Sequence, residues 1–115
     1  MALYVLQSLD VIEAMENFIA RKRPPEHIRP KLDLGYKIED QSIVVFEIRP
    51  QWNKPEVIKE HPVAKATFIK AKKYWKIFWI RSDLKWHSYT PVPTVKTVEE
   101  FTSIVESDKY HCFWG

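Results

Sequence analysis

Apolar residues in the N-terminal part of the chain recur at a helical spacing. Between residues 6 and 25 the residues that define this spacing are Leu9, Ile12, Met15 and Ile19, flanked by Val11 and Phe18. This spacing predicts an amphipathic helix that packs one face against a core. Asp10 suits the first turn of that helix as a cap. The basic residues 21–23 suit its negative end, before Pro24 and Pro25 end it.

The middle of the chain contains short apolar runs, rich in β-branched and aromatic residues, that are typical of strands. The five runs are residues 32–38, 42–50, 63–71, 74–82 and 84–90. Residues 51–62 are polar and contain Pro55 and Pro62, so we predict a loop or a short helical turn there. The short connections between the other runs predict a largely antiparallel sheet.

Residues 97–108 again place apolar side chains on one helical face. Thr97 and Glu100 have the spacing of a capping box, in which each side chain accepts a hydrogen bond from the backbone of the other. The sequence therefore predicts one α+β domain over residues 1–115. It consists of an N-terminal helix, a curved, largely antiparallel sheet of about five strands, and a C-terminal helix, with both helices packed on one sheet face.

The turns between the aromatic strands predict which side chains share a face of the sheet. A two-residue turn at residues 72–73 sets Ala66 opposite Trp79. A tight turn at residues 82–83 then sets Trp86 opposite Trp79, and this tryptophan face is predicted to be core. The first turn has two lysines and lacks the Gly or Asn that such turns favour, so a longer loop that changes the register is the alternative.

The opposite face of the predicted sheet collects polar and charged side chains. On the second strand Val44, Phe46 and Ile48 are expected in the core, which places the intervening residues on the opposite face. The candidate residues of this face are Glu47, Arg49, Lys65, Lys76, Lys85, His87 and Tyr89. Such groups can bind an anion or take part in acid–base chemistry. The alternative is that they pair with one another across strands and form a solvated surface.

The charge of the chain is uneven and is compatible with both interpretations, because scattered lysines also form a solvated surface that keeps a protein dissolved. The formal net charge is only +3, yet residues 63–90 contain seven lysines and arginines and a single acid, Asp83. A concentrated basic patch attracts phosphates at long range. Together with the aromatic residues of the same segment, it predicts a non-enzymatic binding module whose sheet face contacts an anionic partner, with nucleic acid as the preferred class.

Two other functions remain open from the sequence. Asp33, Glu47 and Arg49 resemble the acid and Glu-x-Lys arrangement that holds a divalent ion in one nuclease superfamily, with arginine in place of lysine. A structural homodimer could instead use the aromatic face as its interface. No glycine-rich phosphate loop or Gly-x-Ser-x-Gly elbow is present in the sequence, so no cofactor is predicted. The four histidines are too scattered to predict a metal site with Cys112.

Several word-like segments resemble one uncharacterised bacterial family, a domain of unknown function. They are RPKLDLGYKI, FEIRPQW, PVAKATFIKAKKYWKIFWIRSDLKWHSY and the closing CFWG, and they span the chain from about Arg29 to Gly115. The resemblance implies a small bacterial cytoplasmic protein and carries over no catalytic residue, ligand or partner. The single cysteine, the lack of a signal-like segment and the lack of a long apolar run also predict a cytoplasmic protein that does not cross a membrane.

Overall fold

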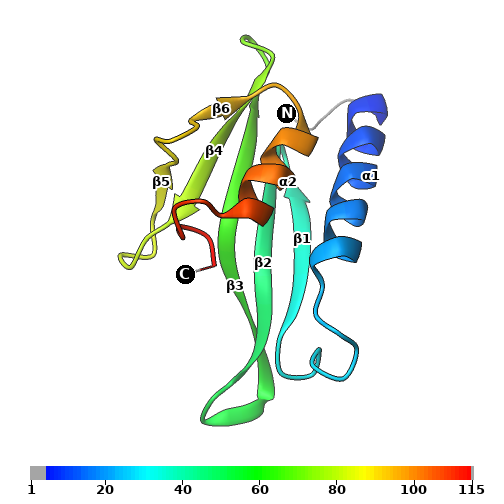
Figure 1. The fold of residues 1–115 in the computed structure, drawn as a ribbon, viewed down its shortest axis with the longest axis vertical. Coiled ribbons are helices and arrows are strands. Elements are labelled where there is room, and N and C mark those ends of the chain that lie inside the picture. The colour runs from blue at the N-terminus through cyan, green and yellow to red at the C-terminus, as the bar shows by residue number, and fades with distance from the viewer. Residues whose placement is uncertain (1–4, 115) are drawn as a thin grey trace.

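The computed structural model describes residues 5–114, with side chains described from Leu9 onward. Figure 1 shows the helices packed against a curved sheet. The elements in chain order are α1 (Val5–Lys22), β1 (Asp33–Glu39), β2 (Ser42–Gln51), β3 (Lys54–Ile69), β4 (Tyr74–Ile80), β5 (Trp86–Ser88), β6 (Thr94–Val95) and α2 (Val98–Ser107).

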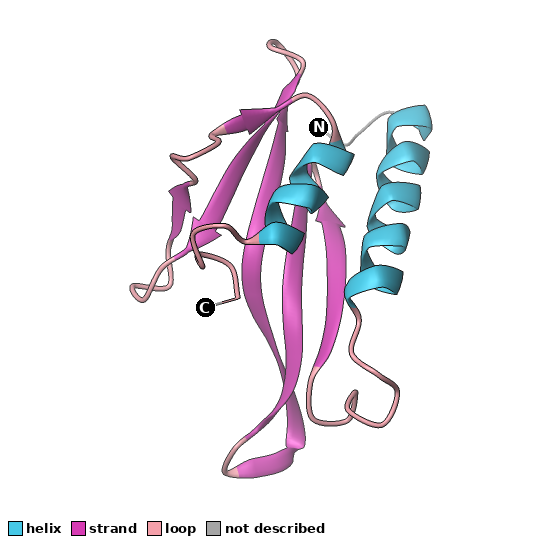
Figure 2. Ribbon diagram, viewed as in Figure 1, coloured by secondary structure: helices cyan, strands magenta, loops and turns pink. Residues whose placement is uncertain are grey.

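The sheet is antiparallel and follows the order of the chain from β1 to β5, while the short β6 pairs with β4 beside β5. Both helices lie on the same face of this sheet, as Figure 2 shows. The predicted α+β fold is therefore confirmed, with six strands instead of about five. The sixth strand is only two residues long and lies in a segment, 91–96, that the sequence presents as a proline-rich loop.

The core lies between the helices and the sheet. It combines one face of α1 and α2 with every second side chain of the central strands. Its fully buried large side chains include Met15, Phe18, Ile43, Ile77 and Phe101. Each contributes roughly 1.5–3 kcal/mol on burial, so this layer holds the helices to the sheet. We call the sheet surface under the helices the helix face.

The ends of the helices can be compared with the caps and end charges predicted from the sequence. Thr97 and Glu100 form the predicted capping box, because the Thr97 side chain accepts from the Glu100 backbone N–H and the Glu100 carboxylate accepts from the Thr97 backbone N–H. The predicted Asp10 cap is wrong, because α1 already begins at Val5 and Asp10 lies inside it. Arg21 and Lys22 occupy the last turn of α1, as predicted.

The turn between β3 and β4 is longer than the predicted two residues. Ile69 pairs with Tyr74, and residues 70–73 form the loop, with Lys73 in the left-handed region at a φ of 57°. Ala66 therefore lies opposite Ile77 and not opposite Trp79. The register differs by two residues, and because strand side chains alternate, a shift of two leaves the faces of both strands as predicted.

The turn between β4 and β5 changes the faces. Trp79 pairs with His87 and Ile80 pairs with Trp86, so the predicted opposition of Trp79 and Trp86 is wrong by one residue. A shift of one residue moves every side chain of β5 to the other face. Trp86 therefore lies on the surface away from the helices. The most deeply buried indole of the described residues is Trp75, with 3% exposure.

The hairpin of β2 and β3 differs from prediction in two ways. Residues 54–62, predicted as a loop, continue β3, so this hairpin is the longest in the sheet. Its two register irregularities lie next to Pro62 and Pro50, because proline has no N–H to donate to the ladder. In addition, Ile43 and Val45 face the helices, and the predicted core positions Val44, Phe46 and Ile48 lie on the opposite face.

Candidate functional site

No helix covers the second face of the sheet within the described residues, and we call this surface the open face (Figure 2). Cross-strand pairing defines its members, because paired residues of an antiparallel sheet point to the same side. The apolar members include Val44, Phe46, Ile48, Phe78, Ile80 and Trp86, and the lysines are Lys37, Lys65 and Lys76. Glu39 and Glu60 lie on the same face, so the open face is aromatic and has a small excess of positive charge.

Lys65 is at the centre of this surface. Its ammonium nitrogen lies 4.9 Å from the ring centroid of Phe78 and 4.9 Å from that of Trp86. Burial lowers the pKa of Lys65 below its ordinary value, and the charge of Glu39 only partly opposes this effect. Among the described residues Lys65 forms no ion pair with a carboxylate. Lys65 is therefore a partly desolvated cation held by two aromatic rings.

The other two lysines differ in how far they are neutralised. Lys76 lies 5.9 Å from the Phe78 centroid and, within residues 5–114, makes no ion pair. Lys37 lies 5.8 Å from the Phe46 centroid but contacts the carboxylates of Glu39 at 3.2 Å and Glu60 at 3.7 Å. Lys65 and Lys76 are thus the cations that the open face offers to a ligand.

A glycine fixes the position of one ring on the open face. Gly35 of β1 pairs with Phe46 of β2, and a Cβ atom on Gly35 would lie only 2.9 Å from the Phe46 ring. The ring therefore packs directly on the glycine backbone. Phe46 is only 7% exposed although no helix covers it, so the sheet itself and the Lys37 stem bury this ring.

The structure divides the predicted candidate residues between the two faces. Lys65 and Lys76 lie on the open face as predicted. Glu47 and Arg49 do not: Glu47 pairs with Leu34, a core residue, and its carboxylate accepts a hydrogen bond from Arg49 at 3.1 Å. The prediction failed there because residues 43–46 are apolar on both faces, so alternation could not show which face is core.

The remaining candidates belong to the helix side or to a turn. Tyr89 is 2% exposed and packs on Phe113 with ring centroids 4.9 Å apart, and burial raises its pKa. His87 shares the face of Trp79, and its Nε2 lies 2.9 Å from the Asp83 carboxylate. Lys85 is exposed in the turn before β5. The one-residue shift of β5 explains these errors, and it also explains why the sequence missed Trp86 as an open-face residue.

The carboxylates proposed for a nuclease are both engaged by arginines. Asp33 accepts two hydrogen bonds from Arg23, at 2.8 and 2.7 Å, and the Arg23 hydrogen bond lowers the pKa of Asp33. Glu47 is paired with Arg49. Within residues 5–114 no group of three or more histidine, cysteine, aspartate or glutamate side chains converges. Asp33 and Glu47, each paired with an arginine, therefore have the geometry of surface ion pairs.

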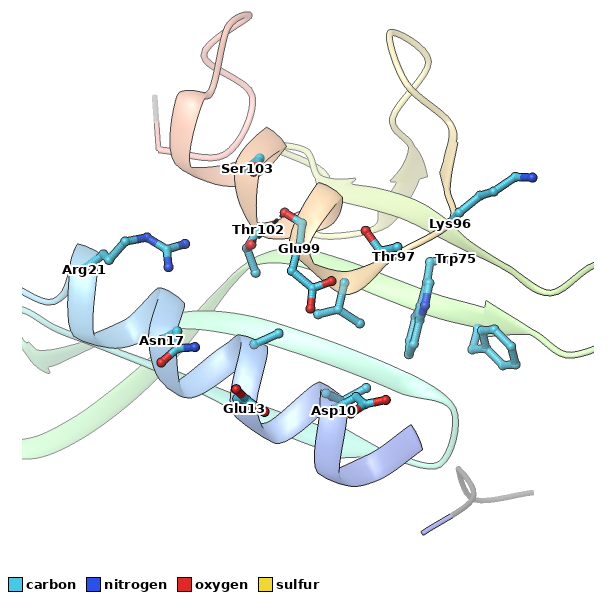
Figure 3. A pocket seen from close by; sticks show the side chains of 14 residues that line it. Asp10, Glu13, Asn17, Arg21, Trp75, Lys96, Thr97, Glu99, Thr102 and Ser103 are labelled. Carbon is cyan, nitrogen blue, oxygen red and sulfur yellow. Dashed lines mark hydrogen bonds between the residues drawn. The ribbon is translucent and has the colours of Figure 1, made fainter. Parts of the chain in front are cut away.

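A groove of about 600 Å³ lies between α1 and α2 (Figure 3). Phe68 and Trp75 are among its apolar lining residues, with ring centroids 5.1 Å apart. The walls carry both signs of charge: Asp10, Glu13, Arg21, Lys96 and Glu99. Arg21 is bound to Glu106 at 3.2 Å. None of the predicted candidate residues lines this groove, and its acidic members make it a poor site for an anion.

The fold and the open face define a small α+β protein with two helices on one side of an antiparallel sheet and an exposed basic, aromatic surface on the other. The chain belongs to the family described as Domain of unknown function (DUF3024), which matches residues 6–115. This match confirms the resemblance to an uncharacterised family. No curated protein and no solved structure matches the chain. Among the described residues, no helix is long and apolar enough to cross a membrane.

Proposed function

We propose that this protein is a non-enzymatic binding module whose open face contacts single-stranded nucleic acid. The observation that carries the proposal is the position of Lys65, whose ammonium group lies 4.9 Å from the ring centroids of both Phe78 and Trp86 on an uncovered sheet face. The rings supply planar surfaces for bases, and the ammonium supplies a charge for phosphate. Sheet-based modules that bind single strands combine these two features.

The energetic cost of burying Lys65 supports a role in binding. An ammonium group that is partly desolvated and lacks a carboxylate partner opposes folding, and its lowered pKa expresses this cost. A phosphate placed against the ammonium would remove much of the cost. Lys76 on the adjacent strand adds a second cation on the same face, and the exposed loop 70–73 adds further lysines at the end of the β3–β4 hairpin.

The test is binding of a labelled mixed-sequence single-stranded oligonucleotide, followed by fluorescence anisotropy over a range of salt concentrations. We expect binding that weakens as salt rises. The double variant Lys65→Gln/Lys76→Gln should flatten the slope of log K against log salt by roughly 0.7 for each phosphate that the variant no longer neutralises. The matched control is Lys96→Gln/Lys109→Gln, which removes the same charge away from the open face.

Other outcomes distinguish the alternative functions. If the wild-type protein does not bind the oligonucleotide at low salt, where electrostatic attraction is strongest, the proposal is wrong. Cutting of the oligonucleotide with added Mg²⁺ or Mn²⁺, abolished by Glu47→Gln, would support the nuclease alternative. A stable dimer in sedimentation, with neither binding nor cutting, would support the structural homodimer.

We also infer a bacterial and cytoplasmic setting for this function. The family resemblance in the sequence points to bacteria, and Cys112, the single cysteine of the chain, is a free thiol that suits a reducing compartment. Single-stranded nucleic acid is available in that compartment. Fractionation of cells that produce the protein, followed by immunodetection, would test the location.

A further inference from the structure

The β2–β3 hairpin extends past the ends of both helices and forms an arm of the molecule, which we define as residues 48–60 (Figure 1). The long dimension of the protein, 45 Å, reflects this extension. At the tip of the arm lies Trp52, which is 91% exposed and is the most exposed of the described large hydrophobic residues. Ile58, further along the arm, is 58% exposed.

Trp52 does not contribute to the core of the protein. It lies in the tight connection between Gln51 and Lys54, away from both helices, and it is not among the residues of the core cluster. An exposed indole on a projecting hairpin gains little from folding, because its apolar surface stays in water. The arm therefore presents a large aromatic ring that the fold does not need.

The arm continues the open face. Phe46 pairs with Pro62, Ile48 with Glu60 and Pro50 with Ile58, so these residues form a track on the side that carries Lys65. Eight residues separate Trp52 from Val44, the partner of Lys65, which corresponds to about 26 Å of strand. The arm carries three exposed cations, Arg49, Lys54 and Lys59, and two exposed acids, Glu56 and Glu60, so its positive excess is small. Lys54, near the tip, can contact a phosphate of a strand that reaches Trp52.

We propose that Trp52 stacks on a base of a single strand that begins at the Lys65 site and runs along the open face to the tip of the arm. This inference rests on the proposed function and adds a requirement for the length of the bound strand. Base stacking tolerates any sequence, because every base has a planar face. The arm thus makes the protein select strands that are long enough to reach Trp52.

The experiment compares labelled oligothymidylates of about 4 and about 12 nucleotides, within the range of about 4–16 that such modules occupy. Trp52→Ala should weaken binding of the long oligonucleotide by about 5- to 150-fold, the range for one stacked base, and should leave the short one unchanged. Trp52→Phe should retain most of the affinity, while Trp52→Leu, which keeps an apolar side chain without a ring, should behave like the alanine variant. Tyr110→Ala removes another exposed aromatic ring, on the helix side of the protein, and is the matched control.

The outcomes separate this inference from the proposed function. If Trp52→Ala binds the long oligonucleotide like the wild type while Lys65→Gln/Lys76→Gln weakens it, the open face binds and the role of Trp52 is wrong. If Trp52→Ala weakens both lengths equally, the inferred path along the arm is wrong. If the wild-type protein binds neither length at low salt, the proposed function fails, and the role of Trp52 fails with it.

Discussion

The ammonium nitrogen of Lys65 lies 4.9 Å from the ring centroid of Trp86, although strand β4 separates the strands that carry the two residues. The lysine reaches across Phe78, its pairing partner, to make this contact. Lys65 therefore contributes both a positive charge and an apolar stem to the open face. A substitution that removes the charge and keeps the stem should reduce binding without reducing stability.

Replacing Lys65 with methionine should reduce binding without reducing stability. Methionine keeps the unbranched apolar stem between Phe78 and Trp86 and removes a charge that burial disfavours. We expect the midpoint of urea unfolding to stay the same or to rise, and oligonucleotide affinity to fall roughly tenfold or more, as for loss of a hydrogen bond to a charged group. The control is Lys109→Met, which removes the same charge from an exposed residue away from the open face. A clear loss of stability in Lys65→Met would instead assign the lysine a structural role.

The lowered pKa of Lys65 predicts the pH dependence of binding. Its ammonium loses the proton at a lower pH than an ordinary lysine, so affinity should decline as pH rises through the folded-state pKa, below about 10.5. Folding stability should change in the opposite direction over this range, because deprotonation relieves the cost of burying the charge. Anisotropy titrations at fixed ionic strength measure the first effect. The same decline in Lys65→Met would show that another group is responsible.

Asp108 is expected to hold the C-terminal segment in place. This residue is 7% exposed, and its carboxylate accepts hydrogen bonds from the backbone N–H groups of Phe113, at 3.1 Å, and Trp114, at 3.0 Å. Asp108→Ala should cost roughly 1.5–3 kcal/mol of unfolding free energy, because both donors lose a charged acceptor. Asp108 also adopts a left-handed φ of 42°, which asparagine tolerates, so Asp108→Asn should cost less. Equal losses in urea titrations of the two variants would argue against this role.

Removal of the residues after His111 should lower the melting temperature. Phe113 is part of the core cluster and packs on Tyr89, and the Trp114 indole donates a hydrogen bond to the Val105 carbonyl at 2.7 Å. Losing a buried phenylalanine alone costs about 3–5 kcal/mol. For a domain of this size a decrease of roughly 10 °C or more follows, measurable by circular dichroism. An unchanged transition would mean that the segment does not stabilise the core.

Tyr36 should make the protein sensitive to high pH. Burial, and secondarily the Glu16 carboxylate on α1, raise the pKa of Tyr36 to about 12. Because the unfolded-state value is lower, near 10, the stabilisation is complete below about pH 10 and is lost as pH rises through about 12. Because burial also raises the pKa of Tyr89, ultraviolet absorbance should show late ionisation of both Tyr36 and Tyr89. Tyr36→Phe should remove the component near pH 12 and reduce the loss of stability at alkaline pH. A component near pH 12 that is unchanged in Tyr36→Phe would contradict the assignment.

Much of the candidate site is not predictable from the sequence. The concentration of lysines and aromatic residues in residues 63–90 is visible in the sequence, and Lys65, Lys76 and Phe78 do share a face. The sequence pattern assigns Trp86 and Phe46 to the core instead. For Trp86 the reason is one residue in the length of the β4–β5 turn, and for Phe46 it is a strand that is apolar on both sides.

Local patterns in the chain are sufficient to specify the helices, the main strands, and the faces of β3 and β4. Helical spacing, the Thr97–Glu100 capping box and the alternation of small and large residues around Ala64 and Ala66 are local signals, and local signals survive in any context. The pairing registers, the continuation of β3 through residues 54–62 and the exposure of Trp52 depend on the assembled sheet. Turn length fixes register, and a change of one residue exchanges the faces of a strand. The position of the Lys65 site therefore depends on contacts between strands, which no single stretch of sequence specifies.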